Sequence, residues 1–217
     1  MIPLQFALRR RMMMAGGGGA PISDLPLGAL INVGTDGGAG TPNYEIADKD
    51  NLVSGGVVLV RKEIYSTSSF GSNVIYANST LDNYINTTIY NKMPQKLRDK
   101  MMDVTFYLSG SGDITRKMFA LSYTMAGFTG SEGKPLQLYT NNALRIKKLN
   151  GSAYVWWLSS QNPYNRIWVI FRNGSNYDAI YGSVVSNSLG VVPAFVIPSK
   201  TPYDPTPNTD GSYNLTL

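Results

Sequence analysis

The sequence predicts an α+β domain built from short antiparallel strands and two helices. Three observations predict this class: short runs of branched and aromatic residues between Gly, Asn and Ser clusters, one segment with helical periodicity, and a proline where a second helix can begin. The 217 residues are 43% hydrophobic, which suits one domain with appendages. We expect an N-terminal anchoring arm over residues 1–22, a domain over residues 23–198 and a Pro-rich C-terminal strap over residues 199–217.

The N-terminal arm is basic and ends in glycines. Arg9, Arg10 and Arg11 follow a short apolar stretch, and residues 16–19 are all glycine. Because a glycine run is a flexible joint, a partner subunit is the simplest means of holding the arm in place. We therefore predict an assembly anchor formed by Phe6 and the three arginines. No long apolar run follows the arginines, so the arm does not resemble a secretory signal.

Both predicted helices lie before the middle of the chain. Asn78–Tyr90 has apolar residues at helical spacing, and Asn78 or Ser79 can cap its first turn. Pro94 suits the first turn of a second helix. The apolar side of that second helix consists of Leu97, Met101 and Met102.

Strands account for most of the remaining predicted structure. Each run is rich in branched or aromatic residues and is bounded by turn-forming residues. The runs are Leu27–Val33, Val57–Val60, Val104–Leu108, Met118–Ser122, Tyr154–Leu158, Ile167–Phe171, Ala179–Val185 and Val191–Ile197. After Pro198 we expect an extended strap with a turn at Asp210-Gly211.

The composition excludes several kinds of chemistry. The chain has no cysteine and no histidine, so thiolate nucleophiles, histidine bases and zinc sites built on cysteine are excluded. Its formal net charge is +5, and the arm supplies three of these charges, which leaves too few for nucleic-acid binding. No segment has the length and apolarity of a membrane span. We expect no enzymatic activity, cofactor, metal, nucleic-acid partner or membrane insertion.

One enzymatic alternative stays open, namely a hydrolase of cell-wall polysaccharide. The candidate acids Asp103, Asp113, Glu132 and Asp178 are scattered along the chain without a recognisable spacing. A pair of catalytic carboxylates can nevertheless be assembled by the fold.

The segment from Ser159 to Ser188 has the composition of a recognition surface. Fourteen of its 30 residues are Asn, Ser or Tyr. Tyrosine gives contact area at low entropic cost, Asn and Ser give adaptable hydrogen bonds, and Trp and Arg are enriched at binding hot spots. The predicted ligand-binding residues are Tyr164, Asn165, Arg166, Trp168, Arg172, Asn173, Asn176, Tyr177, Asp178 and Tyr181. The alternative is that Asn and Ser fill turns while Tyr and Trp pack in the core.

Two segments resemble the motifs of a known family. Tyr154–Ser160 resembles a motif written WWLRS, and Leu189–Phe195 resembles one written GVRPA. Together these motifs mark a domain of unknown function common in Gram-positive bacteria and their prophages. The resemblance covers roughly residues 25–198 and implies a C-type-lectin-like fold. Ser159 and Val192 stand where the family has arginines.

The resemblance and the basic arm together indicate a bacteriophage virion protein at the tail tip, fibre or head surface. The arm would dock to other virion subunits, and the segment from Ser159 to Ser188 would bind a glycan or protein of the host cell surface. A homo-oligomer, with a trimer favoured, would offset weak single-site affinity through avidity. The expected location is the virion, assembled in the cytoplasm of the bacterial host. The non-enzymatic alternative is a structural decoration or baseplate protein.

Overall fold

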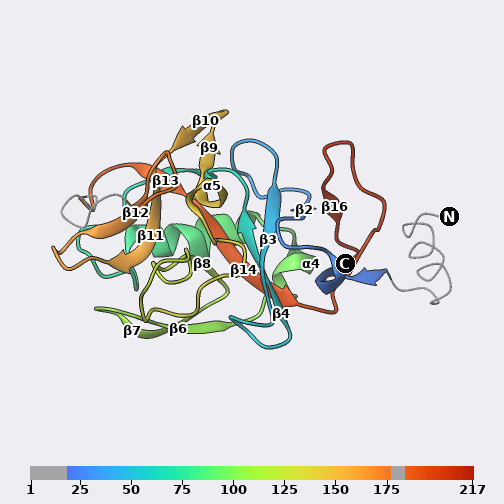
Figure 1. The fold of residues 1–217 in the computed structure, drawn as a ribbon, viewed down its shortest axis with the longest axis horizontal. Coiled ribbons are helices and arrows are strands. Elements are labelled where there is room, and N and C mark those ends of the chain that lie inside the picture. Colours follow the sequence, from blue (N-terminus) through green and yellow to red (C-terminus); the bar gives the residue numbers. More distant parts are fainter. Residues whose placement is uncertain (1–18, 177–183) are drawn as a thin grey trace.

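The computed structural model describes residues 19–176 and 184–217, and most of its regular structure is β-sheet (Figure 1). The larger sheet has six strands, ordered β16-β2-β3-β4-β14-β8. Their bounds are β16 (Tyr213–Asn214), β2 (Leu30–Asn32), β3 (Asn43–Lys49), β4 (Gly56–Arg61), β14 (Pro193–Pro198) and β8 (Met118–Ala120). The central strand β4 is buried along its whole length. Its continuous apolar run Val57–Val60 suits a strand that is covered on both faces.

The smaller sheet has four strands, ordered β12-β11-β13-β5. Their bounds are β12 (Ile167–Ile170), β11 (Trp156–Gln161), β13 (Leu189–Val191) and β5 (Ser66–Ser68). Trp156 and Trp157 are fully buried, and their indole N–H groups donate to the carbonyl oxygens of Arg145 and Ser68, at 3.1 and 2.8 Å. These contacts fix one end of the β11–β12 hairpin in the core, so its turn extends outward.

The remaining elements are short and form separate pairs and turns. Two-stranded pairs are β1 (Ala20–Pro21) with β15 (Pro202–Tyr203), β6 (Val104–Leu108) with β7 (Gly112–Arg116), and β9 (Lys147–Leu149) with β10 (Ser152–Tyr154). Single helical turns are η1 (Ile22–Asp24) and α5 (Asn142–Arg145). The predicted strap contributes β15 and β16, and β16 pairs in parallel with β2.

The first predicted helix is confirmed. It runs without interruption through α2 (Thr80–Asn83), the π-helical η2 (Tyr84–Ile89) and α3 (Tyr90–Lys92). The predicted cap is also present, because the Ser79 hydroxyl accepts the N–H of Asp82 at 3.0 Å.

The prediction of a C-type-lectin-like α+β domain with two helices is wrong. Strands make up 33% and helices 12% of the structure, and in the described ranges only the helix Thr80–Lys92 reaches seven residues. The second predicted helix is reduced to the single turn α4 (Gln95–Arg98). The N–H of Met102 donates to the carbonyl oxygen of Val196 at 2.9 Å, which draws the chain onto β14 and ends the helix. The protein is therefore a mainly β domain.

Most of the predicted strands are confirmed, with changed bounds. The strand predicted over Leu27–Val33 is shortened to β2, because Gly28 has a φ of 82° and breaks the extended backbone. The strand predicted over Ala179–Val185 falls mostly outside the described residues, as does most of the predicted arm.

Two buried ion pairs each have one partner on the larger sheet. Arg61 on β4 donates to Asp36, with 2.6 Å between Nε and Oδ2, and both side chains are almost fully buried. Glu45 on β3 accepts from the ammonium groups of Lys147 and Lys62 and from the hydroxyl of Tyr139. Each carboxylate thus has several charged or polar partners, as buried charges require.

The Glu45 cluster predicts that the protein loses stability in acid. Burial alone would raise the pKa of Glu45, but Lys147 and Lys62 outweigh burial and lower this pKa below its ordinary value. The stabilisation is therefore complete above the pKa of an unfolded glutamate, about 4.3, and is lost as the pH falls through the lower pKa of the folded state. Urea unfolding from about pH 7 down to about pH 3 measures this loss. The variant Glu45→Gln should show a shallower fall in unfolding free energy, whereas an unchanged slope would contradict the assignment.

Candidate functional site

The predicted ligand-binding residues separate into groups at the two ends of β12. Tyr164, Asn165 and Arg166 form the turn between β11 and β12, whereas Arg172, Asn173 and Asn176 follow β12. Trp168 lies within β12 itself. Tyr177, Asp178 and Tyr181 lie outside the described residues, as do the predicted anchor residues Phe6, Arg9, Arg10 and Arg11.

A cavity of about 460 Å³ lies beside the β11–β12 turn. Its walls are the turn residues 164–166, the loop 72–75 and residues 184–185. Tyr164, Ile75 and Val184 are 55%, 40% and 48% exposed. These three are half of the six large hydrophobic side chains that are exposed in the described part of the chain, so exposed apolar surface is concentrated at this cavity, here called the turn cavity.

Local hydrogen bonds give the turn cavity a defined shape. The side-chain oxygen of Asn162 accepts the N–H groups of Tyr164 and Arg166, both at 3.0 Å. Asn165 has a φ of 57°, a conformation that asparagine tolerates better than most residues. The N–H of Phe70 donates to the carbonyl oxygen of Val185 at 2.9 Å, which joins the two other walls. A ligand would therefore meet a largely preformed surface, at a lower entropic cost.

Trp168 does not line the turn cavity. Its ring stacks on Tyr123, with centroids 4.5 Å apart, and Tyr123 in turn stacks on Phe128. The guanidinium group of Arg145 lies 4.2 Å from the Phe128 centroid. The amide of Asn176 donates to the Tyr123 hydroxyl, so Trp168 and Asn176 meet at Tyr123 in a packed aromatic stack.

Arg172 and Asn173 line a different cavity, of about 400 Å³, together with Val155 and Phe171. The loop that carries them is packed tightly against α5. A Cβ atom at Gly174 would lie 1.8 Å from the carbonyl oxygen of Asn142, and its φ of 79° also requires glycine. The structure therefore does not join these residues to the Tyr164 turn in one site.

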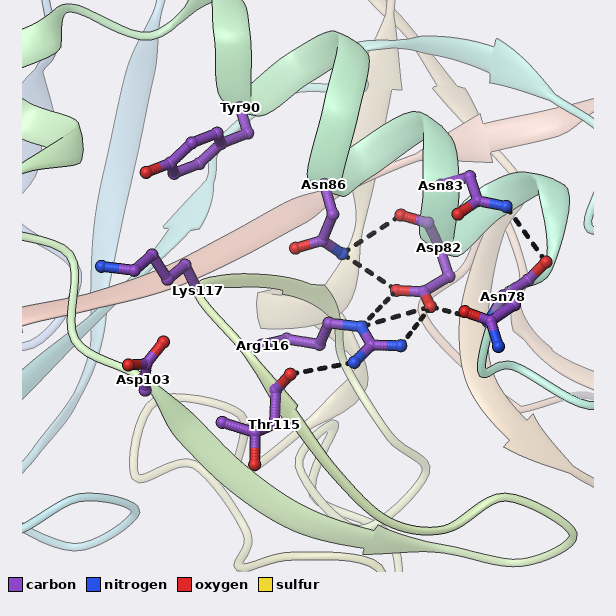
Figure 2. Close-up of a pocket in the computed structure, with 9 residues that line it drawn as sticks. All are labelled: Asn78, Asp82, Asn83, Asn86, Tyr90, Asp103, Thr115, Arg116 and Lys117. Atoms are coloured by element: carbon purple, nitrogen blue, oxygen red, sulfur yellow. Dashed lines mark hydrogen bonds and ion pairs between the residues drawn. The ribbon is translucent and has the colours of Figure 1, made fainter.

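A third cavity, of about 470 Å³, is polar and was not found from the sequence (Figure 2). It lies between the helix Thr80–Lys92 and the β6–β7 hairpin. Asp82 and Arg116 form a two-pronged ion pair across it, with Oδ1 2.9 Å from Nε and Oδ2 2.7 Å from Nη2. These hydrogen bonds raise the pKa of Arg116 above its ordinary value, although partial burial opposes the change.

Asp82 also has a structural role at the start of the helix. Its Oδ2 accepts the backbone N–H of Asn78 at 2.9 Å, while Ser79 accepts the N–H of Asp82. The Ser79 side chain thus caps the helix, and Asp82 ties the residue before the cap to the first turn. The spacing Ser79-x-x-Asp82 is the one sequence signal that could have drawn attention to Asp82; its pairing with Arg116 had no local signal.

The candidate acids do not form an evident catalytic pair. Asp103 lines the polar cavity, Asp113 is exposed on β7, and Glu132 is buried and accepts the N–H of Ser109 at 2.8 Å. Asp178 lies outside the described residues. Within residues 19–176 and 184–217, no three carboxylates converge in a way that could hold a metal ion. None of the helices in these ranges is long and apolar enough to span a bilayer.

Comparison with known proteins yields one match. A family model described as Domain of unknown function (DUF6273) matches residues 55–199. This range begins just before β4 and ends just after β14, so it includes all three cavities. No curated protein and no solved structure matches the chain.

Proposed function

The chain belongs to the family described as Domain of unknown function (DUF6273), and on that premise we propose that it is a bacteriophage virion protein whose turn cavity, called the receptor cavity from here on, binds a protein on the host surface. The concentration of exposed Tyr164, Ile75 and Val184 at one cavity carries this proposal. A cluster of aromatic and aliphatic side chains with a polar rim is the usual centre of a protein–protein contact. Ser72 and Asn73 supply that rim.

The arrangement of the fold supports a role in display. The β11–β12 turn lies at one end of the longest axis of the molecule, and the blue strand β1, where the described chain begins, lies near the other end (Figure 1). A domain attached to a particle through its N-terminal segment would therefore present the receptor cavity away from the attachment point. The basic arm and the resemblance to prophage-encoded domains support the virion as the location, and a trimer would strengthen binding through avidity.

Binding of the labelled full chain to intact Gram-positive cells tests the proposal. Tyr164→Ala should weaken binding at least about tenfold, as expected when a hot-spot aromatic is removed. Tyr107→Ala is the matched control, because Tyr107 is 49% exposed on β6 but does not line the receptor cavity. Protease treatment of the cells should abolish binding.

Two outcomes would contradict the proposal. Binding that survives protease treatment would assign the cavity to a glycan instead of a protein. If a panel of Gram-positive strains binds neither the chain nor an artificially trimerised form, the structural virion role is favoured instead.

A further inference from the structure

The polar cavity has hydrogen-bonding groups that its structural role does not use. The Asn86 amide donates from Nδ2 to both the carbonyl oxygen and Oδ1 of Asp82, at 3.1 and 2.9 Å. Since both partners are acceptors, the amide orientation is fixed and Oδ1 must face away from Asp82. In Figure 2 this oxygen points toward the open side, where Tyr90 and Lys117 lie. The helix thus holds a fixed acceptor at the cavity.

Arg116 supplies fixed donors to the same cavity. Its Nε and Nη2 donate to Asp82, and its Nη1 donates to the carbonyl oxygen of Thr115 at 2.9 Å. Nη1 and Nη2 each carry a second N–H that these bonds do not use. The Arg116 side chain is 23% exposed, so solvent can reach the group. The ion pair therefore holds further N–H donors of Arg116 in the lining of the cavity that also contains Asn86.

The charges of the cavity balance. Asp82 and Arg116 neutralise each other, and the remaining lining charges are Asp103 and Lys117. Asp103 is exposed and has no hydrogen-bond partner among the described residues. The ring of Tyr90 forms one side of the cavity and gives it an aromatic surface (Figure 2). A ligand with many hydroxyl groups and no net charge matches this lining better than an anion or a cation.

We propose that the polar cavity binds a neutral sugar residue. Both this ligand and this site are separate from those of the receptor proposal. Sugar hydroxyl groups both donate and accept, so one hydroxyl can donate to Asn86 Oδ1 while another accepts from Arg116. Asp103 accepts from a further hydroxyl at the open side, and the Tyr90 ring contacts the apolar face of the sugar. The bonds to Asn78 and Arg116 account for Asp82, and the sugar accounts for the fixed groups of Asn86 and Arg116 that point away from Asp82.

Titration of the ¹⁵N-labelled full chain with methyl glycosides of glucose, galactose and N-acetylglucosamine tests this proposal by NMR. We expect at least one glycoside to shift the side-chain signals of Asn86 and Arg116. Arg116→Lys keeps the charge that pairs with buried Asp82 but removes the fork of donors, so it should weaken binding at least about tenfold. Asp103→Asn should also weaken binding. Asp113→Asn is its matched control on the same hairpin and should bind like the parent chain.

Three results would overturn the proposal. These are no shift at the cavity with any of the three glycosides, unchanged affinity in an Arg116→Lys variant that thermal unfolding shows to be folded, and shifts produced only by inorganic phosphate. Tyr164→Ala should leave sugar binding unchanged, because Tyr164 does not line this cavity. The sugar proposal and the receptor proposal can therefore fail separately.

Discussion

Replacing Asp36 by alanine is expected to lower the free energy of unfolding by about 3–5 kcal/mol, the usual cost of removing one partner from a buried ion pair. Asp36 accepts from Nε of Arg61 at 2.6 Å, from the Tyr44 hydroxyl at 3.1 Å and from the N–H of Gly38 at 2.9 Å. Without it, the fully buried Arg61 guanidinium keeps only the carbonyl oxygens of Glu63 and Ala39 as hydrogen-bond acceptors. Neither of them carries the compensating negative charge.

Urea unfolding at neutral pH measures this effect. The control Asp113→Asn changes an exposed carboxylate and should alter the free energy of unfolding by less than about 0.5 kcal/mol. Adding Arg61→Met to Asp36→Ala should recover part of the loss, because the unpaired charge is then removed. A loss below about 1 kcal/mol for Asp36→Ala would show that water reaches this ion pair.

Replacing Trp157 by alanine is expected to cost about 3–5 kcal/mol. The indole is fully buried, its ring centroid lies 5.6 Å from that of Phe70, and its N–H donates to the carbonyl oxygen of Ser68. Phe70 begins the loop that leads to Ile75 at the receptor cavity. The same variant should therefore also weaken cell binding, because it loosens two walls of that cavity.

A second Trp157 variant and a second tryptophan separate these contributions. Trp157→Phe keeps an aromatic ring but loses the hydrogen bond, so it should cost about 0.5–1.5 kcal/mol plus a small cavity term. Trp168→Ala should cost less than Trp157→Ala, because Trp168 is only half-buried at the end of the aromatic stack. Circular dichroism follows unfolding without depending on the tryptophan that is replaced. Equal losses for Trp157→Ala and Trp168→Ala would contradict this account of the core.

The features that could be predicted from the sequence are those with local causes. The helix Thr80–Lys92 follows from its own periodicity and from the Ser79 cap. The prediction of a full second helix was wrong because the N–H of Met102 donates to the carbonyl oxygen of Val196. Val196 is distant in the sequence, so no local pattern indicates where the helix ends. The length of α4 therefore depends on where β14 lies.

The candidate site shows the same division. A Tyr- and Asn-rich turn between two strands indicated an exposed surface, and Tyr164 is indeed exposed. The sequence around Trp168 is also rich in Asn and Tyr, but Trp168 stacks on Tyr123, which in turn stacks on Phe128. Both partners come from another segment of the chain. Ile75 and Val184 reach the same cavity as Tyr164 through tertiary packing, and the pairing of Asp82 with Arg116 joins a helix to a hairpin. No local pattern encodes either arrangement.

Photo-crosslinking from the receptor cavity would show whether a protein of the host surface contacts it. The variant Tyr164→p-benzoylphenylalanine places a photoreactive group at the cavity, and Tyr107→p-benzoylphenylalanine places it on exposed β6. After illumination on intact Gram-positive cells, we expect a covalent product with a cell-surface protein from position 164 and little or none from position 107. Equal products from both positions, or none from position 164 on cells that bind the chain, would contradict a receptor contact at this cavity.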